Sequence, residues 1–126
     1  MISGKPSSFC LLPYSAGSAV KYLQRSNSSM IIYEITAIVE PHLIGDYEKY
    51  MREQHIPDLL ATGYFAAAFL TKAESGRYRV QYHAHDRNAL DNYLQTEADR
   101  LRADFLSHFP EGITVTRENW EILRAW

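Results

Sequence analysis

The stretch MREQHIPDLLATGYF, from Met51 to Phe65, decides the fold of this chain. It starts as the end of an amphipathic helix and then reaches Pro57, which removes a helical hydrogen bond and clashes one turn back. Proline also disfavours helical geometry at the residue before it, so the first helix is predicted to end near His55. A short second helix then begins at Pro57, and Gly63 is a natural stop before a strand.

Residue periodicity predicts the elements on either side of this stretch. IIYEITAIVE and RYRVQYHAH alternate sharply and are rich in β-branched or aromatic residues, which is typical of strands. The turn AESG makes the second and third strands a hairpin. The predicted strands cover residues 31–40, 64–72, 77–85 and 113–123, and the predicted helices cover residues 41–54, 57–62 and 87–109.

Side-chain spacing also predicts which faces are buried. Tyr47, Met51 and His55 recur every four residues and so share one helix face. Asp86 is placed to cap the long helix. In the second strand, alternation puts Phe65, Ala67 and Phe69 on one face.

The element order is β-α-β-β-α-β, which predicts a ferredoxin-like α+β fold. In that fold a four-stranded antiparallel sheet carries two helices on one face. Its other face mixes polar and apolar side chains here, so it either meets solvent or packs against a twin sheet. The remaining apolar residues favour the second arrangement, a dimeric α+β barrel that encloses a cavity.

The composition limits the classes of function. The chain has 126 residues, enough for one domain, and its net charge of −2 gives no overall attraction to nucleic acid. A single cysteine, Cys10, excludes an internal disulfide and a cysteine-cluster metal site. No apolar run approaches the roughly 18 residues of a membrane span. We therefore expect a cytoplasmic protein that contacts neither membrane nor nucleic acid.

Residues 1–29 differ from the remainder, since they contain eight serines, three basic residues and no acid. We expect a poorly ordered extension ahead of a domain over residues 30–126. The favoured interpretation is sequence upstream of a true start at Met30, directly before the first strand. A transit peptide and a secretory signal are the alternatives, although Pro13 and Gly17 interrupt the apolar stretch that a signal would need.

Four stretches, MIIYEITAIVE, MREQHIPDLLATGYFAAAFL, RVQYHA and ALDNYLQTEADRLRADF, resemble a small bacterial domain family of unknown function. The most specific part runs from His55 to Asp58 and from Thr62 to Phe65. The family belongs to the dimeric α+β-barrel superfamily, so the resemblance implies a homodimer whose two sheets face each other. It implies no reaction. Relatives in the superfamily include cofactor-independent monooxygenases, haem-degrading enzymes, lactone isomerases and ligand sensors, which is analogy at the level of fold.

Two groups of side chains are candidates for binding a small molecule. The first lies on the outer face of the central strands, where neighbouring side chains sit about 5 Å apart. The second group is Tyr47 and His55. The histidine could act as a hydrogen-bond donor or a general base at the cavity mouth. The predicted ligand-binding residues are Glu34, Thr36, Tyr47, His55, Arg79, Gln81 and His83.

Each candidate also has a structural interpretation, which we favour. His55 can close the first helix by bonding its last carbonyls, and Asp58 can begin the next helix. A His55–Asp58 pair is a weaker alternative. Glu34 can pair with Arg79 or contact His83 in a dimer interface or in solvent, and Trp120 on the last strand is a plausible dimer contact.

Neither a metal nor a cofactor is expected. His83 and His85 form only a His-x-His pattern without a third ligand at a known distance. For haem, nothing singles out His55 or His108.

The leading hypothesis is a homodimeric small-molecule-binding or regulatory module. The second is a cofactor-independent monooxygenase- or isomerase-like enzyme, with His55 or His83 as base and Tyr47 or Tyr82 in support. The third is a structural or interaction dimer with a filled barrel.

Overall fold

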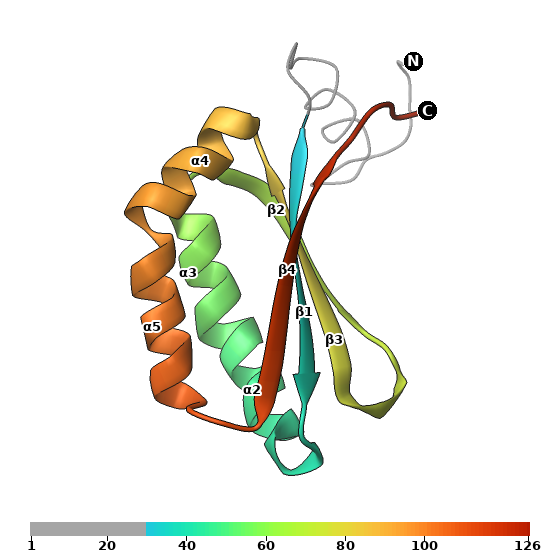
Figure 1. Ribbon diagram of the computed structural model, residues 1–126, viewed down its shortest axis with the longest axis vertical. Helices are drawn as coiled ribbons and strands as arrows, with labels where there is room; N and C mark the ends of the chain where they lie inside the picture. Colours follow the sequence, from blue (N-terminus) through green and yellow to red (C-terminus); the bar gives the residue numbers. More distant parts are fainter. Residues whose placement is uncertain (1–29) are drawn as a thin grey trace, which may run out of the picture.

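The computed structural model describes residues 30–126, and the predicted N-terminal extension, residues 1–29, lies outside the described residues. The described part forms one sheet with helices over one face (Figure 1). The strands are β1 Ile31–Val39, β2 Phe65–Lys72, β3 Arg77–Ala84 and β4 Ile113–Glu121. The helical segments are η1 Pro41–Leu43, α2 Ile44–Tyr50, η2 Met51–His55, α3 Ile56–Ala61, η3 Glu74–Gly76, α4 Arg87–Thr96 and α5 Ala98–His108.

The sheet is antiparallel throughout, in the order β2-β3-β1-β4. This order, with all helices on the same side, confirms the predicted ferredoxin-like α+β fold. The helix-facing side chains of β1 and β3 make the core with residues from the helices. Val80, Tyr82 and Leu90 are fully buried there. Asp86 accepts a hydrogen bond from the amide of Ala89 at 2.8 Å, which confirms it as the cap of α4.

The prediction that a helix ends at His55 is wrong. Ile56 is helical, with φ −65° and ψ −44°, so the chain continues as one helical run from α2 through α3. The accommodation is a π-type turn, η2, in which the amide of Ile56 bonds the carbonyl of Met51, five residues back. This wider turn gives the Pro57 ring room that a regular turn would deny it. Gly63, with φ +86°, ends the run as predicted.

The predicted helix over residues 87–109 is two helices that meet at an angle (Figure 1). Glu97, with φ −122° and ψ −30°, breaks the helical geometry between α4 and α5. The Thr96 hydroxyl donates to the carbonyl of Asn92 at 2.7 Å, an interaction that bends helices. The break lets α5 turn and run along the sheet over β1 and β4.

The prediction that Phe65, Ala67 and Phe69 share a face is also wrong. A β-bulge between Phe65 and Ala67 shifts the alternation, so Phe65 enters the core whereas Phe69 faces away from the helices. We define the open face as the side of the sheet without helices in the described chain. Its side chains, assigned from the strand register, are Ile32, Glu34, Thr36, Ile38, Ala67, Phe69, Thr71, Arg77, Arg79, Gln81, His83, Thr114, Thr116, Glu118 and Trp120.

Candidate functional site

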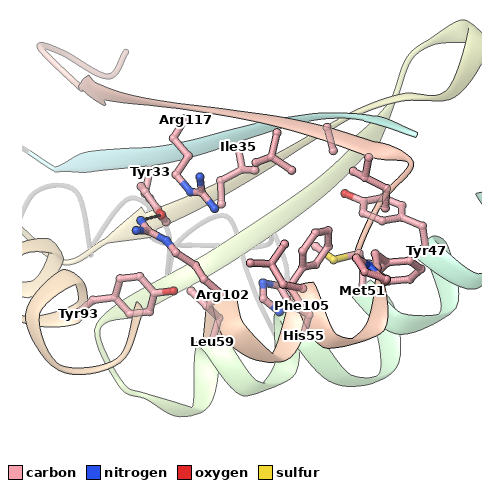
Figure 2. Close-up of a pocket in the computed structure, with 16 residues that line it drawn as sticks. Tyr33, Ile35, Tyr47, Met51, His55, Leu59, Tyr93, Arg102, Phe105 and Arg117 are labelled. Atoms are coloured by element: carbon pink, nitrogen blue, oxygen red, sulfur yellow. Dashed lines mark hydrogen bonds between the residues drawn. The ribbon is translucent and has the colours of Figure 1, made fainter. Parts of the chain in front are cut away.

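A pocket of about 330 Å³ lies between the sheet and the helices (Figure 2). Strands β1 and β4 form its roof, and the helical run and α5 form its floor. Ala37 and Val115, which oppose each other where β1 pairs with β4, give this part of the roof comparatively small side chains. The lining residues are Tyr33, Ile35, Ala37, Tyr47, Met51, His55, Leu59, Tyr93, Arg102, Phe105, Leu106, Phe109, Pro110, Ile113, Val115 and Arg117.

The character of this lining is apolar with a few polar groups. Ile35, Met51, Leu59 and Phe105 supply hydrocarbon and ring surface from four different elements. The polar groups are the imidazole of His55, the two guanidinium groups and the tyrosine hydroxyls. Small-molecule sites typically combine apolar walls with a few placed polar groups in a volume of about 300–1,000 Å³, and this pocket falls in that range.

The π-type turn brings His55 into the pocket wall, only 8% exposed. Its Nδ1 lies 3.4 Å from the Tyr50 hydroxyl oxygen, and that hydroxyl donates its single proton to Asp104 at 2.7 Å. The Tyr50 oxygen can therefore only accept from His55, which places the imidazole proton on Nδ1. This arrangement leaves Nε2 of His55 as a hydrogen-bond and proton acceptor.

His55 is neutral at physiological pH. Burial lowers its pKa from the ordinary 6.5 to about 4. The carboxylates of Asp104 and Asp58 oppose this shift, whereas the nearby positive charge of Arg117 reinforces it. Burial, together with the hydrogen bond to Asp104, also raises the pKa of Tyr50, so its hydroxyl keeps its proton. The series of hydrogen bonds from His55 through Tyr50 to Asp104 therefore orients an uncharged imidazole.

Two arginines contribute positive charge at the other end of the pocket. Arg102 extends from α5 and Arg117 from β4, and their side chains point toward one another beside Tyr33 (Figure 2). Arg102 donates to the Tyr33 hydroxyl at 2.9 Å. The lining contains no acidic residue to neutralise them.

The structure separates the predicted ligand-binding residues into two places. Tyr47 and His55 line the pocket, whereas Glu34, Thr36 and the others project from the open face. The predicted Glu34–Arg79 pair is present, with Oε2 and Nε 3.6 Å apart. These sites are on opposite sides of one sheet, so no single small molecule can touch both groups within a protomer.

The predicted residues on the open face largely form hydrogen bonds, ion pairs and ring contacts with other residues of that face. Glu34 is only 7% exposed and accepts from the Gln81 amide at 2.9 Å as well as pairing with Arg79. His83 packs its ring 5.3 Å from that of Phe69, and burial lowers its pKa. Thr36 and Arg79 line a second hollow of about 230 Å³ near the β2–β3 turn.

Two residues with proposed supporting roles also have clear positions. Tyr82 is sealed in the core, and its hydroxyl has no hydrogen-bond partner in residues 30–126. Burial raises its pKa well above the ordinary value, so it stays protonated. Asp58 is exposed and makes no hydrogen bond or ion pair with His55, whose ring contacts Tyr50 instead.

Neither Arg102 nor Arg117 is among the residues predicted from the sequence, although both fit its periodicity. Arg117 follows Ile113 and Val115 in the helix-facing alternation of the last strand. Arg102 lies four residues after Ala98 on the buried face of the last helix. Each is a charged residue at a position where the periodicity calls for an apolar one, and this feature of the sequence identifies both arginines.

Within residues 30–126, no cluster of histidine, cysteine and acidic residues is placed to hold a metal ion. None of the helices in this range has the length and apolarity needed to cross a bilayer.

Comparisons with known proteins place the chain among proteins of undefined role. The model of a family described as a domain of unknown function, DUF4286, matches residues 30–123. A comparison with curated proteins finds no match.

Three solved structures share the fold at low sequence identity. A dimeric ferredoxin-like protein from an uncultured marine organism is 13% identical, with a TM-score of 0.60 over 79% of this chain and 100% of that one. A protein of unknown function from Nitrosomonas europaea is 16% identical, with a TM-score of 0.59 over 80% and 96%. A conserved protein of unknown function from Bacteroides thetaiotaomicron, described as a possible oxidoreductase, is 14% identical, with a TM-score of 0.59 over 75% and 99%.

Proposed function

The chain belongs to the DUF4286 family, and from that premise we propose that it is a homodimer that binds one small molecule in each protomer, in the pocket between sheet and helices. The observation that carries this proposal is the pocket itself: about 330 Å³ of space, apolar walls, and a few polar groups aimed inward. Well-packed interiors contain few voids larger than a water molecule, so a space of this size is unusual.

The pocket is a better site than the open face because its polar groups have unused bonding capacity. Nε2 of His55 is an acceptor, and the arginines Arg102 and Arg117 make no ion pair in the described chain. On the open face, Glu34 already bonds both Gln81 and Arg79. A ligand gains more by satisfying open donors and acceptors than by displacing existing partners.

The proposed dimer pairs the open faces of two protomers. Support comes from three large apolar side chains that the protomer leaves about half exposed there, Ile38 at 53%, Phe69 at 48% and Trp120 at 48%. They are spread over β1, β2 and β4 of this one face, and apolar surface left exposed in a protomer is typical of an interaction surface. The marine ferredoxin-like protein, which shares this fold, is dimeric.

Filling the pocket should abolish ligand binding while the protein stays folded. Val115 lines the pocket from the edge strand β4, so Val115→Trp occupies part of the space at a stability cost of about 1–3 kcal/mol. The matched control is Val115→Ala, which also perturbs packing at this position but enlarges the space. Both variants and the unmodified protein are screened against a metabolite library by thermal shift.

Compounds that raise the melting temperature of the unmodified protein should also stabilise Val115→Ala and leave Val115→Trp unaffected. If Val115→Trp keeps the same stabilising compounds, the ligand site lies elsewhere and the proposal is wrong.

A further inference from the structure

We propose that the ligand of this pocket is an organic carboxylate with an apolar body, and that its acid group binds between Arg102 and Arg117. This inference rests on the proposed function and specifies the chemical class of the ligand.

The first observation is two like charges brought together without a counter-charge. The guanidinium groups of Arg102 and Arg117 converge from opposite walls beside Tyr33 (Figure 2). Neither takes part in an ion pair within residues 30–126. An anion placed between two cations is attracted by both of them.

Some other arginines of the described chain do have a carboxylate partner. Arg52 pairs with Glu48, Arg79 with Glu34, and Arg100 with Glu97. The first and third of these pairs are on the surface, where a pair contributes little, whereas Glu34 of the second is buried. Arg77, Arg87 and Arg124 also form no ion pair within residues 30–126, so Arg102 and Arg117 are distinguished by lining one pocket together.

The second observation is an unsatisfied donor on Arg102. Its Nη2 donates to Tyr33, but its Nε is buried and has no hydrogen-bond partner in the described chain. A guanidinium carries five N–H donors, and a buried donor without a partner is costly. The acid whose charge acts on Arg102 is Asp99, one turn earlier on α5, and it is exposed and forms no ion pair with Arg102. The guanidinium of Arg102 therefore has donor capacity that residues 30–126 do not use.

The shape and lining of the pocket select a carboxylate over other anions. A planar carboxylate matches the geometry of a guanidinium group and can accept two bonds from it. The remaining walls, including Ile35, Leu59 and Phe105, offer hydrocarbon contact and would leave the hydroxyls of a sugar phosphate unsatisfied. Because His55 is neutral, the positive charge is confined to the arginine end, which suits a ligand charged at one end only.

The test compares acids with their uncharged amides, using the full chain at pH 7. The probes are benzoate, 4-phenylbutyrate and octanoate, each against its primary amide, with dissociation constants from isothermal titration calorimetry. At least one acid should bind tighter than its amide by about tenfold or more. Arg117→Gln, a substitution of an exposed edge-strand residue, should weaken the binding of that acid by about 10- to 100-fold. It should change the affinity for the amide by less than about threefold.

The matched control is Arg87→Gln, which removes the same charge from an exposed residue of α4 outside the pocket. It should leave both affinities unchanged. Equal affinity of acid and amide, or an Arg117→Gln variant that binds the acid as well as the unmodified protein, would overturn the carboxylate inference while the pocket proposal stands. Competition by inorganic phosphate at a similar affinity would also overturn it, because the site would then recognise any anion. Failure of every probe contradicts the inference too, and the Val115 pair decides separately whether the pocket binds anything.

Discussion

Replacing Trp120 with glutamate should convert the protein from a dimer to a monomer. Trp120 lies on the open face, opposite Ile32 in the β1–β4 register, and is 48% exposed in the protomer. In a two-fold dimer one substitution removes the side chain from both halves of the interface and places two carboxylates in it. If each copy loses about 2 kcal/mol of association free energy, about 4 kcal/mol in all, the dimer dissociation constant rises roughly a thousandfold.

Light scattering at micromolar protein concentration measures this change as a fall from the mass of two chains to the mass of one. Phe69→Glu, on the opposite edge strand of the same face, should have the same effect. Leu123→Glu is the control, because Leu123 is more exposed, at 85%, but follows the end of β4. A monomeric unmodified protein, or a Trp120→Glu variant that remains dimeric, would show that the open face does not join two protomers.

Acidification should destabilise the folded protein through His55. The folded state lowers the pKa of this residue to about 4, mainly by burial, whereas the unfolded chain keeps the ordinary 6.5. Between these values the unfolded chain binds a proton that the folded protein excludes, so the free energy of unfolding falls as the pH falls. The contribution of His55 is fully present above pH 6.5, and about 3 kcal/mol of it is lost by pH 4.

Urea unfolding at pH 7.0 and pH 4.5, at one fixed protein concentration, measures this loss. His55→Gln cannot take up the proton, so it should lose about 2 kcal/mol less than the unmodified protein over this interval. His83→Gln is the comparison variant, because burial lowers the pKa of half-buried His83 as well, but by less than that of His55. It should therefore also lose less stability than the unmodified protein, but by a smaller margin than His55→Gln. If His55→Gln lost as much stability as the unmodified protein, His55 would not be the buried neutral group described here.

The order of the elements could be predicted from sequence because it depends on local periodicity. Alternating residues of β1 and β3 determine which side faces the helices, and the caps and turns at Asp86 and Gly63 are local in origin. The incorrect predictions lie at positions where two local conformational preferences compete. Pro57 predicted a helix end, but a single wide turn accommodates the ring, and a bulge at Phe65 reversed the alternation of β2.

The candidate site was only partly predictable because it forms from segments far apart in the chain. Periodicity correctly placed His55 on a buried helix face, but it could not show that Tyr50 and Asp104, 54 residues apart, would meet beside it. Nor could it bring Arg102 and Arg117 together, since their approach depends on the break at Glu97 that turns α5 along the sheet. The open-face group was easier to predict because strand pairing fixes its neighbours.

Methyl-resolved NMR during a screen of small-molecule fragments tests the central claim most directly, because β1 reports on both sides of the sheet. Ile35 faces the pocket, and Leu59 faces it from α3, whereas Ile32 and Ile38 belong to the open face. We predict that binding fragments shift the methyl signals of Ile35 and Leu59 and leave those of Ile32 and Ile38 in place. Fragments that shift only Ile32 and Ile38, or a library in which none shifts Ile35 and Leu59, would contradict a ligand site between sheet and helices.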